Sequence, residues 1–307
     1  MKKTIKEPKI NNLMDLLKRF PNEEACREFL EQSRWNGKPI CFHCGHTEKI
    51  YRIQNGKLYK CGKCRKPFSI KMGTIFEDSA LPLQKWFHAM FVVSAHKKGI
   101  SSCQLAKDIS VRQATAWHML HRIRLTMSTG SFEKPLNGIV EIDETFIGGK
   151  PRRFGKRGFP HDKAIAFGAI QRNGKARIQT IPDTKGDTLK SAVREIVSPD
   201  SIVMTDNYKG YAGLDKEYKE HGVISHSTHQ YVNGIIHTNT IEGFWSLLKR
   251  GIVGIYHHTS KKHLHRYCEE FEYRYNSRKL VDSDRFGMLL GACNGRLTYK
   301  NLIHSSK

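Results

Sequence analysis

The sequence lacks the features of a membrane or secreted protein. It has no run of about 18 apolar residues, the length that a membrane-spanning helix needs. Its first residues, MKKTIKEPKINN, contain lysines but no apolar segment after them, so we expect no secretory signal. Internal repeats and low-complexity tracts are also missing, and aromatic residues at 10% exclude a wholly disordered chain. These absences favour a folded protein of a prokaryotic cytoplasm.

Acidic residues are scarce beside basic ones. The chain has 29 Asp and Glu against 52 Lys and Arg, a formal net charge of +23. Residues 1–130 carry +14 of that charge in well under half of the length. Such an excess usually serves a polyanionic partner, most often nucleic acid. We therefore expect a DNA-binding front half, a larger globular back half, association with the nucleoid and no membrane partner.

Four of the eight cysteines form two C-x-x-C pairs separated by 16 residues. They are Cys41, Cys44, Cys61 and Cys64. Each pair places two thiolates on one edge of a tetrahedron, so two facing pairs complete a site for one structural Zn²⁺. The segment between them reads as a β-hairpin around Asn55-Gly56, which predicts a zinc ribbon. His43 and His46 are alternative ligands, although four cysteines suffice. The missing secretory signal argues against disulfides.

Two basic regions follow that favour contacts with DNA. The first surrounds the second cysteine pair. In the second, residues 83–96 are apolar at helical spacing, and Ser101 or Ser102 caps a short helix. After a turn at 109–111, a longer basic helix runs from 112 to 127, which is the pattern of a helix-turn-helix. The candidate DNA contacts are Lys63, Arg65, Lys66, Arg112, Thr115, His118 and Arg122.

The back half changes to strands. Strands are predicted at 138–147, 164–170, 176–181 and 201–206, with a helix at 186–197 before the last of them. The first and fourth strands carry the acids Asp143 and Asp206. This order is that of an RNase H-like, retroviral-integrase-like α/β core, in which those two strands are parallel neighbours and their carboxylates meet. Strand phase puts Asp143 and Glu144 on opposite faces and does not decide between them.

A helix at about 238–250 follows, with a polar face. Glu242 and Lys249 are seven residues apart, which is within roughly 20° of two full turns, so both lie on one face. Asn239 and Ser246 lie near the same stripe. The face can therefore present a metal-binding carboxylate together with a phosphate-binding lysine.

Three long segments carry a resemblance to a known family. They are VEIDETFIGGK, TDNYKGY and HTNTIEGFWSLLKRGIVGIYHH. With the ribbon, they make nearly the whole chain resemble the ISXO-type insertion-sequence transposases, a DDE family with an N-terminal zinc ribbon. The resemblance implies that Asp143, Asp206 and Glu242 are catalytic carboxylates and that Lys249 is the basic residue after them. Because members vary at the third acid, Asn239 is the alternative for that position.

The resemblance implies a chemistry that suits these residues. In-line attack on a phosphodiester uses two Mg²⁺ or Mn²⁺ ions about 3.5–4 Å apart, and Mg²⁺ prefers carboxylate oxygens. Asp143 would bridge the ions, with Asp206 and Glu242 each flanking one. Histidines around the third motif are expected to contact phosphate or carry protons, with a Zn²⁺ site as the weaker alternative. They are His226, His229, His237, His257 and His258.

The expected function is that of an insertion-sequence transposase. Such a protein binds the ends of its element in double-stranded DNA, cleaves them and transfers the strands to target DNA, as a homodimer or a higher synaptic assembly. A transcription regulator with a degenerate core and a metal nuclease acting on RNA are the alternatives. The expected divisions are a helical segment (1–35), the ribbon (36–72), the helix-turn-helix region (73–130), the catalytic core (131–285) and a C-terminal tail (286–307).

Overall fold

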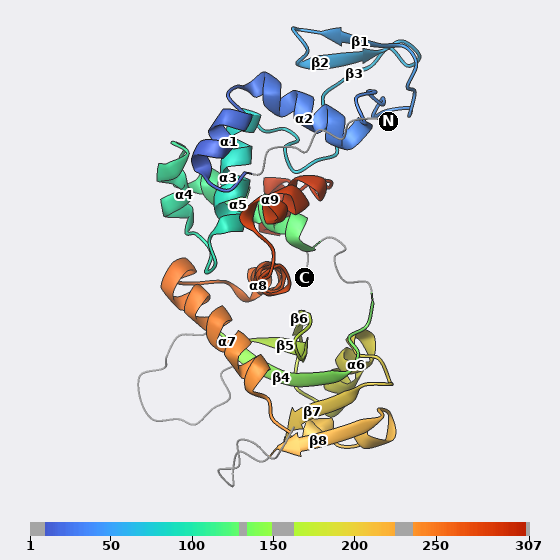
Figure 1. Cartoon of the computed structure of the whole chain (residues 1–307), viewed down its shortest axis with the longest axis vertical. Helices are drawn as coiled ribbons and strands as arrows, with labels where there is room; N and C mark the ends of the chain where they lie inside the picture. The colour runs from blue at the N-terminus through green and yellow to red at the C-terminus, as the bar shows by residue number, and fades with distance from the viewer. Residues whose placement is uncertain (1–9, 129–133, 149–162, 225–235, 305–307) are drawn as a thin grey trace. The chain divides into compact units, whose positions relative to one another are not determined.

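The chain folds into two compact units. A computed structural model describes residues 10–128, 134–148, 163–224 and 236–304 (Figure 1). One unit combines residues 1–129 with residues 280–307, and the other is formed by residues 130–279. No helix of the described ranges has both the length and the apolar character needed to cross a membrane.

The first unit consists of helices and one small sheet. Its helices are α1 (Leu13–Arg19), α2 (Glu23–Trp35), α3 (Leu83–Ala95), α4 (Ser102–Asp108), α5 (Gln113–Ser128), α9 (Asp282–Gly291) and α10 (Tyr299–His304). Asn22 and Ser101 cap α2 and α4 through their side chains, and Ser101 is one of the two residues expected to cap the short helix. The antiparallel sheet contains β1 (Ile50–Ile53), β2 (Leu58–Cys61) and β3 (Pro67–Phe68).

The hairpin between β1 and β2 turns at the expected dipeptide. The Lys57 amide donates a hydrogen bond to the Gln54 carbonyl at 3.1 Å. Asn55 and Gly56 are the central residues of this turn, with φ values of 54° and 76°. Two positive φ angles make the turn match the twist of the strands on either side, which explains the Asn-Gly sequence.

The C-terminal segment belongs to the first unit rather than to a tail. Phe286 of α9 is 2% exposed and packs edge-to-face against Phe87 of α3, with ring centroids 6.1 Å apart. Phe87 in turn meets Phe20 at 4.8 Å. Because aromatic contacts of this kind stabilise a core beyond the area that they bury, α9 is an integral part of the unit. The second compact unit ends at Lys279, whereas the catalytic core was expected from the sequence to run to residue 285.

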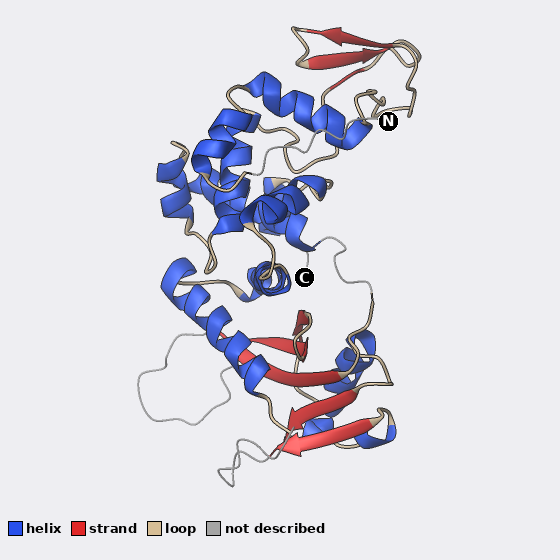
Figure 2. Cartoon of the chain, viewed as in Figure 1, coloured by secondary structure: helices blue, strands red, loops and turns tan. Residues whose placement is uncertain are grey.

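The second unit is built on a five-stranded mixed sheet (Figure 2). Its strands are β4 (Ile139–Ile147), β5 (Ala164–Gln171), β6 (Ala176–Ile181), β7 (Ile202–Asp206) and β8 (Glu220–Ile224). Their order across the sheet is β6-β5-β4-β7-β8. β4 pairs antiparallel with β5 and parallel with β7, so the first and fourth strands are parallel neighbours, as the sequence pattern predicted.

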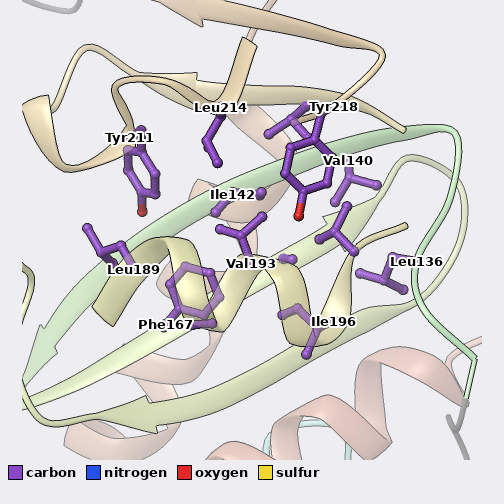
Figure 3. Close-up of a cluster of buried hydrophobic side chains, with 14 of the residues drawn as sticks. Leu136, Val140, Ile142, Phe167, Leu189, Val193, Ile196, Tyr211, Leu214 and Tyr218 are labelled. Atoms are coloured by element: carbon purple, nitrogen blue, oxygen red, sulfur yellow. The ribbon is translucent and has the colours of Figure 1, made fainter. Parts of the chain in front are cut away.

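Helices cover both faces of this sheet. On one face lie α6 (Gly186–Ile196) and two short 3₁₀ turns, Lys209–Tyr211 and Leu214–Lys216, which bury Val140 and Ile142 of β4 (Figure 3). On the other face lie α7 (Asn239–Gly251) and α8 (Leu264–Asn276). A π-helical turn at Ile252–Tyr256 and a 3₁₀ turn at Lys261–His263 connect these two helices. Alternate residues of β4 therefore meet different helices.

Helix α8 also bonds to the backbone of the edge strand β6. The Ile178 amide donates to a carboxylate oxygen of Glu272 at 2.7 Å, and the Ala176 amide donates to the Asn276 side chain, also at 2.7 Å. Side chains of the helix therefore satisfy backbone groups of β6 that no neighbouring strand reaches. Burial raises the pKa of Glu272 to about 7.

Candidate functional site

The four paired cysteines meet in the first unit. Their Sγ atoms all lie within 4.8 Å of one another, and the Cys41–Cys64 and Cys44–Cys61 distances are both 3.7 Å. Four thiolates at about 2.3 Å from a tetrahedral Zn²⁺ would be roughly 3.8 Å apart, so the spacing suits the ion.

The backbone repeats the same turn at both cysteine pairs. The Gly45 amide donates to the Cys41 carbonyl, and the Arg65 amide donates to the Cys61 carbonyl, both at 2.9 Å. Gly45 and Arg65 both adopt positive φ angles, 69° and 58°. Two equivalent turns that face each other are what a four-cysteine site requires.

The two histidines considered as alternative ligands are engaged elsewhere. The His43 Nε2 atom lies 3.1 Å from the Pro67 carbonyl, and the Lys49 amide donates to His46 Nε2 at 3.3 Å. Neither ring belongs to the group of ligand atoms that meet within 4.8 Å. The four cysteines therefore form the candidate zinc site.

We expect Cys44→Ser to release the metal. Elemental analysis of the purified wild-type chain should find about one tightly held Zn²⁺ per protomer, and the variant should lose it, since serine offers no thiolate. The ribbon should then unfold locally while the second unit stays folded. Cys103→Ser is the matched control, because Cys103 is an exposed cysteine of α4 outside the cluster. Full zinc content in the Cys44 variant would contradict this assignment.

Two of the predicted catalytic acids lie side by side in the second unit. The parallel pairing of β4 with β7 aligns Glu141 with Met204. Two residues further along both strands, Asp143 and Asp206 are level, and register partners in parallel strands point to the same face. Asp206 is the last residue of β7. The end of β7 therefore brings the Asp206 carboxylate beside that of Asp143, the middle residue of β4.

The surroundings of Asp143 disfavour its charged form. Burial raises the pKa of Asp143 to about 7, with further contributions from the negative charges of Glu144 and Asp206. The indole N–H of Trp245 opposes this shift by donating to Asp143 Oδ2 at 2.9 Å. A partly buried carboxylate crowded by two others is the electrostatic setting that a divalent cation would relieve.

Glu144 lies on the opposite face of β4, as strand phase requires. Its carboxylate accepts a hydrogen bond from the buried Tyr211 hydroxyl of the 3₁₀ turn that follows β7. Burial is the main cause that raises the pKa of Glu144, and the charge of Asp206 adds to it. The charge of Glu144 thus influences both aspartates, but its hydrogen bond is to Tyr211 on the face of the sheet that α6 covers.

Helix α7 presents the remaining predicted residues on its exposed side. Glu242, Lys249 and Asn239 are all exposed, while Phe244 and Leu248 are buried, so the predicted polar face exists. The Thr238 hydroxyl donates to a Glu242 carboxylate oxygen at 2.9 Å. Within the described residues, the cysteine quartet is the one group of three or more Cys, His, Asp or Glu side chains whose ligand atoms are already gathered as a metal ion would require. Asp143, Asp206 and Glu242 are not gathered in that way.

Sequence reasoning missed Glu141, which is a fully buried carboxylate of β4. It forms an ion pair with Arg172 at 2.6 Å, and it accepts hydrogen bonds from the first turn of α7. His237 Nδ1 lies 3.3 Å from its Oε1 atom, whereas His226 and His229 fall outside the described residues. Residues two apart on a strand share a face, so the strand pattern places Glu141 beside Asp143. A charged residue on a strand face that is otherwise buried needs a partner, and this could have identified Glu141 from the sequence.

The structure divides the predicted DNA contacts into two groups. Lys63, Arg65, Lys66 and Arg112 are exposed, and Thr115 and His118 are half-buried. Arg122 differs, because it is 5% exposed, donates to the Glu77 carbonyl and lies over the Trp86 ring at 5.1 Å from its centroid. Burial lowers the pKa of Arg122 to about 10. Arg122 thus stabilises the unit and is removed from the set of candidate DNA contacts.

Comparison with known protein families finds matches for two segments of the chain. Residues 135–276 match the ISXO2-like transposase domain, and residues 21–67 match a transposase zinc-ribbon domain. The chain belongs to the ISXO2-like transposase family. The two domain matches contain the cysteine quartet and all of the predicted catalytic acids.

Two relatives of the chain carry names that agree with the family. An "uncharacterized protein in transposable element ISH50" of Halobacterium salinarum is 29% identical over 286 residues, which cover 84% of this chain and 92% of that protein. An "uncharacterized transposase-like protein" of Haemophilus influenzae is 34% identical over 113 residues, which cover 34% of this chain and 86% of that protein. No solved structure shows significant similarity to the chain.

Proposed function

We propose that this ISXO2-like transposase binds the ends of an insertion sequence and catalyses metal-dependent cleavage and strand transfer of DNA. The observation that carries the proposal is the placement of Asp143 and Asp206 on two parallel neighbouring strands, each two residues beyond the paired Glu141 and Met204, where the charge of Asp206 raises the pKa of Asp143. Helix α7 carries Glu242 and Lys249 on its exposed face. The strand order and the alternate use of the two sheet faces support an RNase H-like core.

The donors fit Mg²⁺ or Mn²⁺ in kind, because carboxylate oxygens are the ligands that these ions prefer and Asp143 and Asp206 lie close enough to raise the pKa of Asp143. Asp143 would be shared by two such ions, with Asp206 on one side and Glu242 on the other, and Asn239 is the alternative to Glu242. When bound, the ions activate the attacking oxygen and stabilise the leaving oxygen of an in-line displacement. The protein orients the carboxylates and holds the DNA, and the Lys249 ammonium is available for a phosphate close to the scissile bond.

A strand-transfer assay tests the proposed activity. Purified protein, DNA carrying an end of its own element and a target duplex should give joined products in Mg²⁺ or Mn²⁺, and none in a chelator. Joining two ends requires at least two protomers, so we expect a dimer or a higher assembly on end DNA. Binding of end DNA without any cleavage or joining would favour the regulator with a degenerate core. Cleavage of RNA but not of DNA would favour the nuclease.

The first unit is proposed to supply most of the DNA affinity. Exposed basic residues at the second cysteine pair and at the start of α5 support this role, and α4 with α5 supports a helix-turn-helix. Lys63, Arg65 and Lys66 of the ribbon are exposed, and so is Arg112 directly before α5. These side chains can therefore neutralise phosphates.

We expect binding of duplex DNA by the whole chain to weaken steeply with salt. Each neutralised phosphate adds about 0.9 to the slope of log K against log salt, so Lys63→Ala with Arg65→Ala should lower the slope by up to roughly 1.8. Lys216→Ala with Lys219→Ala is the control, because both are exposed lysines of the second unit. Titrations from low to physiological salt measure the slopes. An unchanged slope in the ribbon variant would remove the ribbon from the DNA-binding surface.

A further inference from the structure

The indole of Trp245 makes a directed contact with Asp143. Trp245 is 4% exposed and lies on α7, and its Nε1–H donates to Asp143 Oδ2 at 2.9 Å. An indole N–H is a donor only, so this bond favours the ionised carboxylate and restrains the rotation of its two oxygens. Oδ2 is committed to the indole, which leaves Oδ1 free of that contact.

A glycine on the neighbouring strand makes room for the indole. Gly168 of β5 is the register partner of Asp143. A Cβ atom at Gly168 would lie 2.8 Å from the Trp245 Cη2 atom and 2.8 Å from the Ile178 Cδ1 atom, which is closer than real Cβ contacts. The indole therefore lies across β5 at the level of Asp143, in a position that any side chain at 168 would displace.

Glu141 provides a second contact between β4 and the same helix. Its Oε2 atom accepts from the Thr240 amide at 2.7 Å and from the Ile241 amide at 3.1 Å. These amides belong to the first turn of α7, where backbone N–H groups have no partner within the helix. A buried carboxylate at this end also interacts favourably with the helix dipole.

The two contacts are separated both along the strand and along the helix. Glu141 and Asp143 are two residues apart on one face of β4, a rise of about 6.7 Å. From the midpoint of Thr240 and Ile241 to Trp245 is four to five residues of α7, a rise of about 6.8 Å. The two contacts therefore join α7 to β4 at two separate points, one in the first turn of the helix and one at Trp245.

We propose that Trp245 is a positioning residue. Seated against Gly168, it fixes the rotation of the Asp143 carboxylate and, together with Glu141, holds α7 against β4, so that Asp143 and Glu242 can bind the same metal ion. This inference rests on the proposed function, because it assigns the contact to the same carboxylates. Trp245 does not touch the ions or the DNA in this scheme. It acts through Asp143, as outer partners of metal ligands do.

Binding of Mn²⁺ to the whole protein tests the proposal without a catalytic readout. The ribbon is first loaded with Zn²⁺, and free Mn²⁺ is then followed by electron paramagnetic resonance. Trp245→Phe removes the indole N–H and keeps an aromatic ring. Gly168→Ala places a methyl group against the indole and should displace it from Asp143. Loss of an outer partner typically costs about 10–100-fold in metal affinity, so both variants should raise the Kd for Mn²⁺ by about 10-fold or more.

Two controls and a reference variant complete the experiment. Gly243→Ala adds a methyl group on the exposed side of α7, where a Cβ would meet nothing within 4 Å, and Trp117→Phe makes the same exchange in the first unit. Both should bind Mn²⁺ like the wild type. Thermal unfolding and zinc content show whether each variant is folded, and Trp245→Phe alone decides if Gly168→Ala does not fold.

The outcomes separate the inference from the proposed function. If Asp143→Asn loses Mn²⁺ while folded Trp245→Phe binds it like the wild type, the positioning role is wrong and the catalytic assignment stands. If Asp143→Asn binds Mn²⁺ like the wild type, both are wrong. A Kd raised by Trp245→Phe and by Asp143→Asn, but not by the two controls, supports the proposal.

Discussion

Asp143→Asn is expected to abolish cleavage and joining of element ends while binding of those ends stays close to normal. The substitution keeps the volume of the side chain and can still accept from the Trp245 indole, but it removes the negative charge that a metal ion requires. Losing an outer partner already costs about 10–100-fold, so losing a direct ligand should cost more. The measurement compares strand-transfer rates with end-binding affinities for the same preparations.

Asp206→Asn should have the same effect, because its carboxylate lies level with that of Asp143. Asp183→Asn serves as the matched control, since Asp183 is an acid before α6 that bonds to Thr188 rather than to either aspartate. It should retain strand transfer. Near-normal joining by the Asp143 or Asp206 variants in Mg²⁺ would refute the assignment of these two acids.

The third ligand is decided by comparing two residues of one helix turn. Glu242→Gln should abolish joining and Asn239→Ala should be milder, because a neutral amide attracts Mg²⁺ less than a carboxylate does. Lys249→Ala should weaken the placement of end phosphates, so extra Mg²⁺ should not restore it. If Asn239→Ala is inactive and Glu242→Gln joins normally, the third position belongs to Asn239.

Local pattern was sufficient to predict the elements that carry the candidate site. Alternation in residues 138–147 and the apolar run before Asp206 indicated two strands, and the structure has them as β4 and β7. The seven-residue spacing of Glu242 and Lys249 predicted a shared exposed face on a helix, and α7 has it. Periods of two and 3.6 residues are local properties, which is why sequence alone reveals them.

Contacts between distant segments were not predictable in the same way. The sequence pattern predicted that Arg122 faces DNA from a helix. Its actual position over the Trp86 ring depends on how α5 packs against α3. Phe286 packs in the aromatic core of the first unit although residues 130–279, the second unit, lie between Phe286 and Phe87 in the sequence. A local hydrophobic period cannot predict such a contact. Gly168 has a meaning only once Asp143 is its partner across the strands. Each of these features is set by tertiary packing rather than by propensity.

Glu141→Gln is expected to destabilise the second unit by about 3 kcal/mol or more, although the two side chains have nearly the same shape. Oε1 of Glu141 accepts from Arg172 Nε at 2.6 Å and from the Thr240 hydroxyl at 2.9 Å, while Oε2 accepts from the Thr240 and Ile241 amides. Every one of these partners is a donor. An amide NH₂ group would therefore face two donors in either orientation, and Arg172 would keep a charge without its buried partner.

Hydrogen exchange in increasing urea measures this effect in the second unit separately from the first. Peptides from β5 and β6 should lose protection at a lower urea concentration in Glu141→Gln than in the wild type, while peptides from α3 should not change. Glu195→Gln is the control, because Glu195 is an exposed acid of α6 and its loss should leave the midpoint in place. An unchanged midpoint for Glu141→Gln would show that the carboxylate does not hold α7 to β4, because the four donors around it would then be satisfied equally well by an amide.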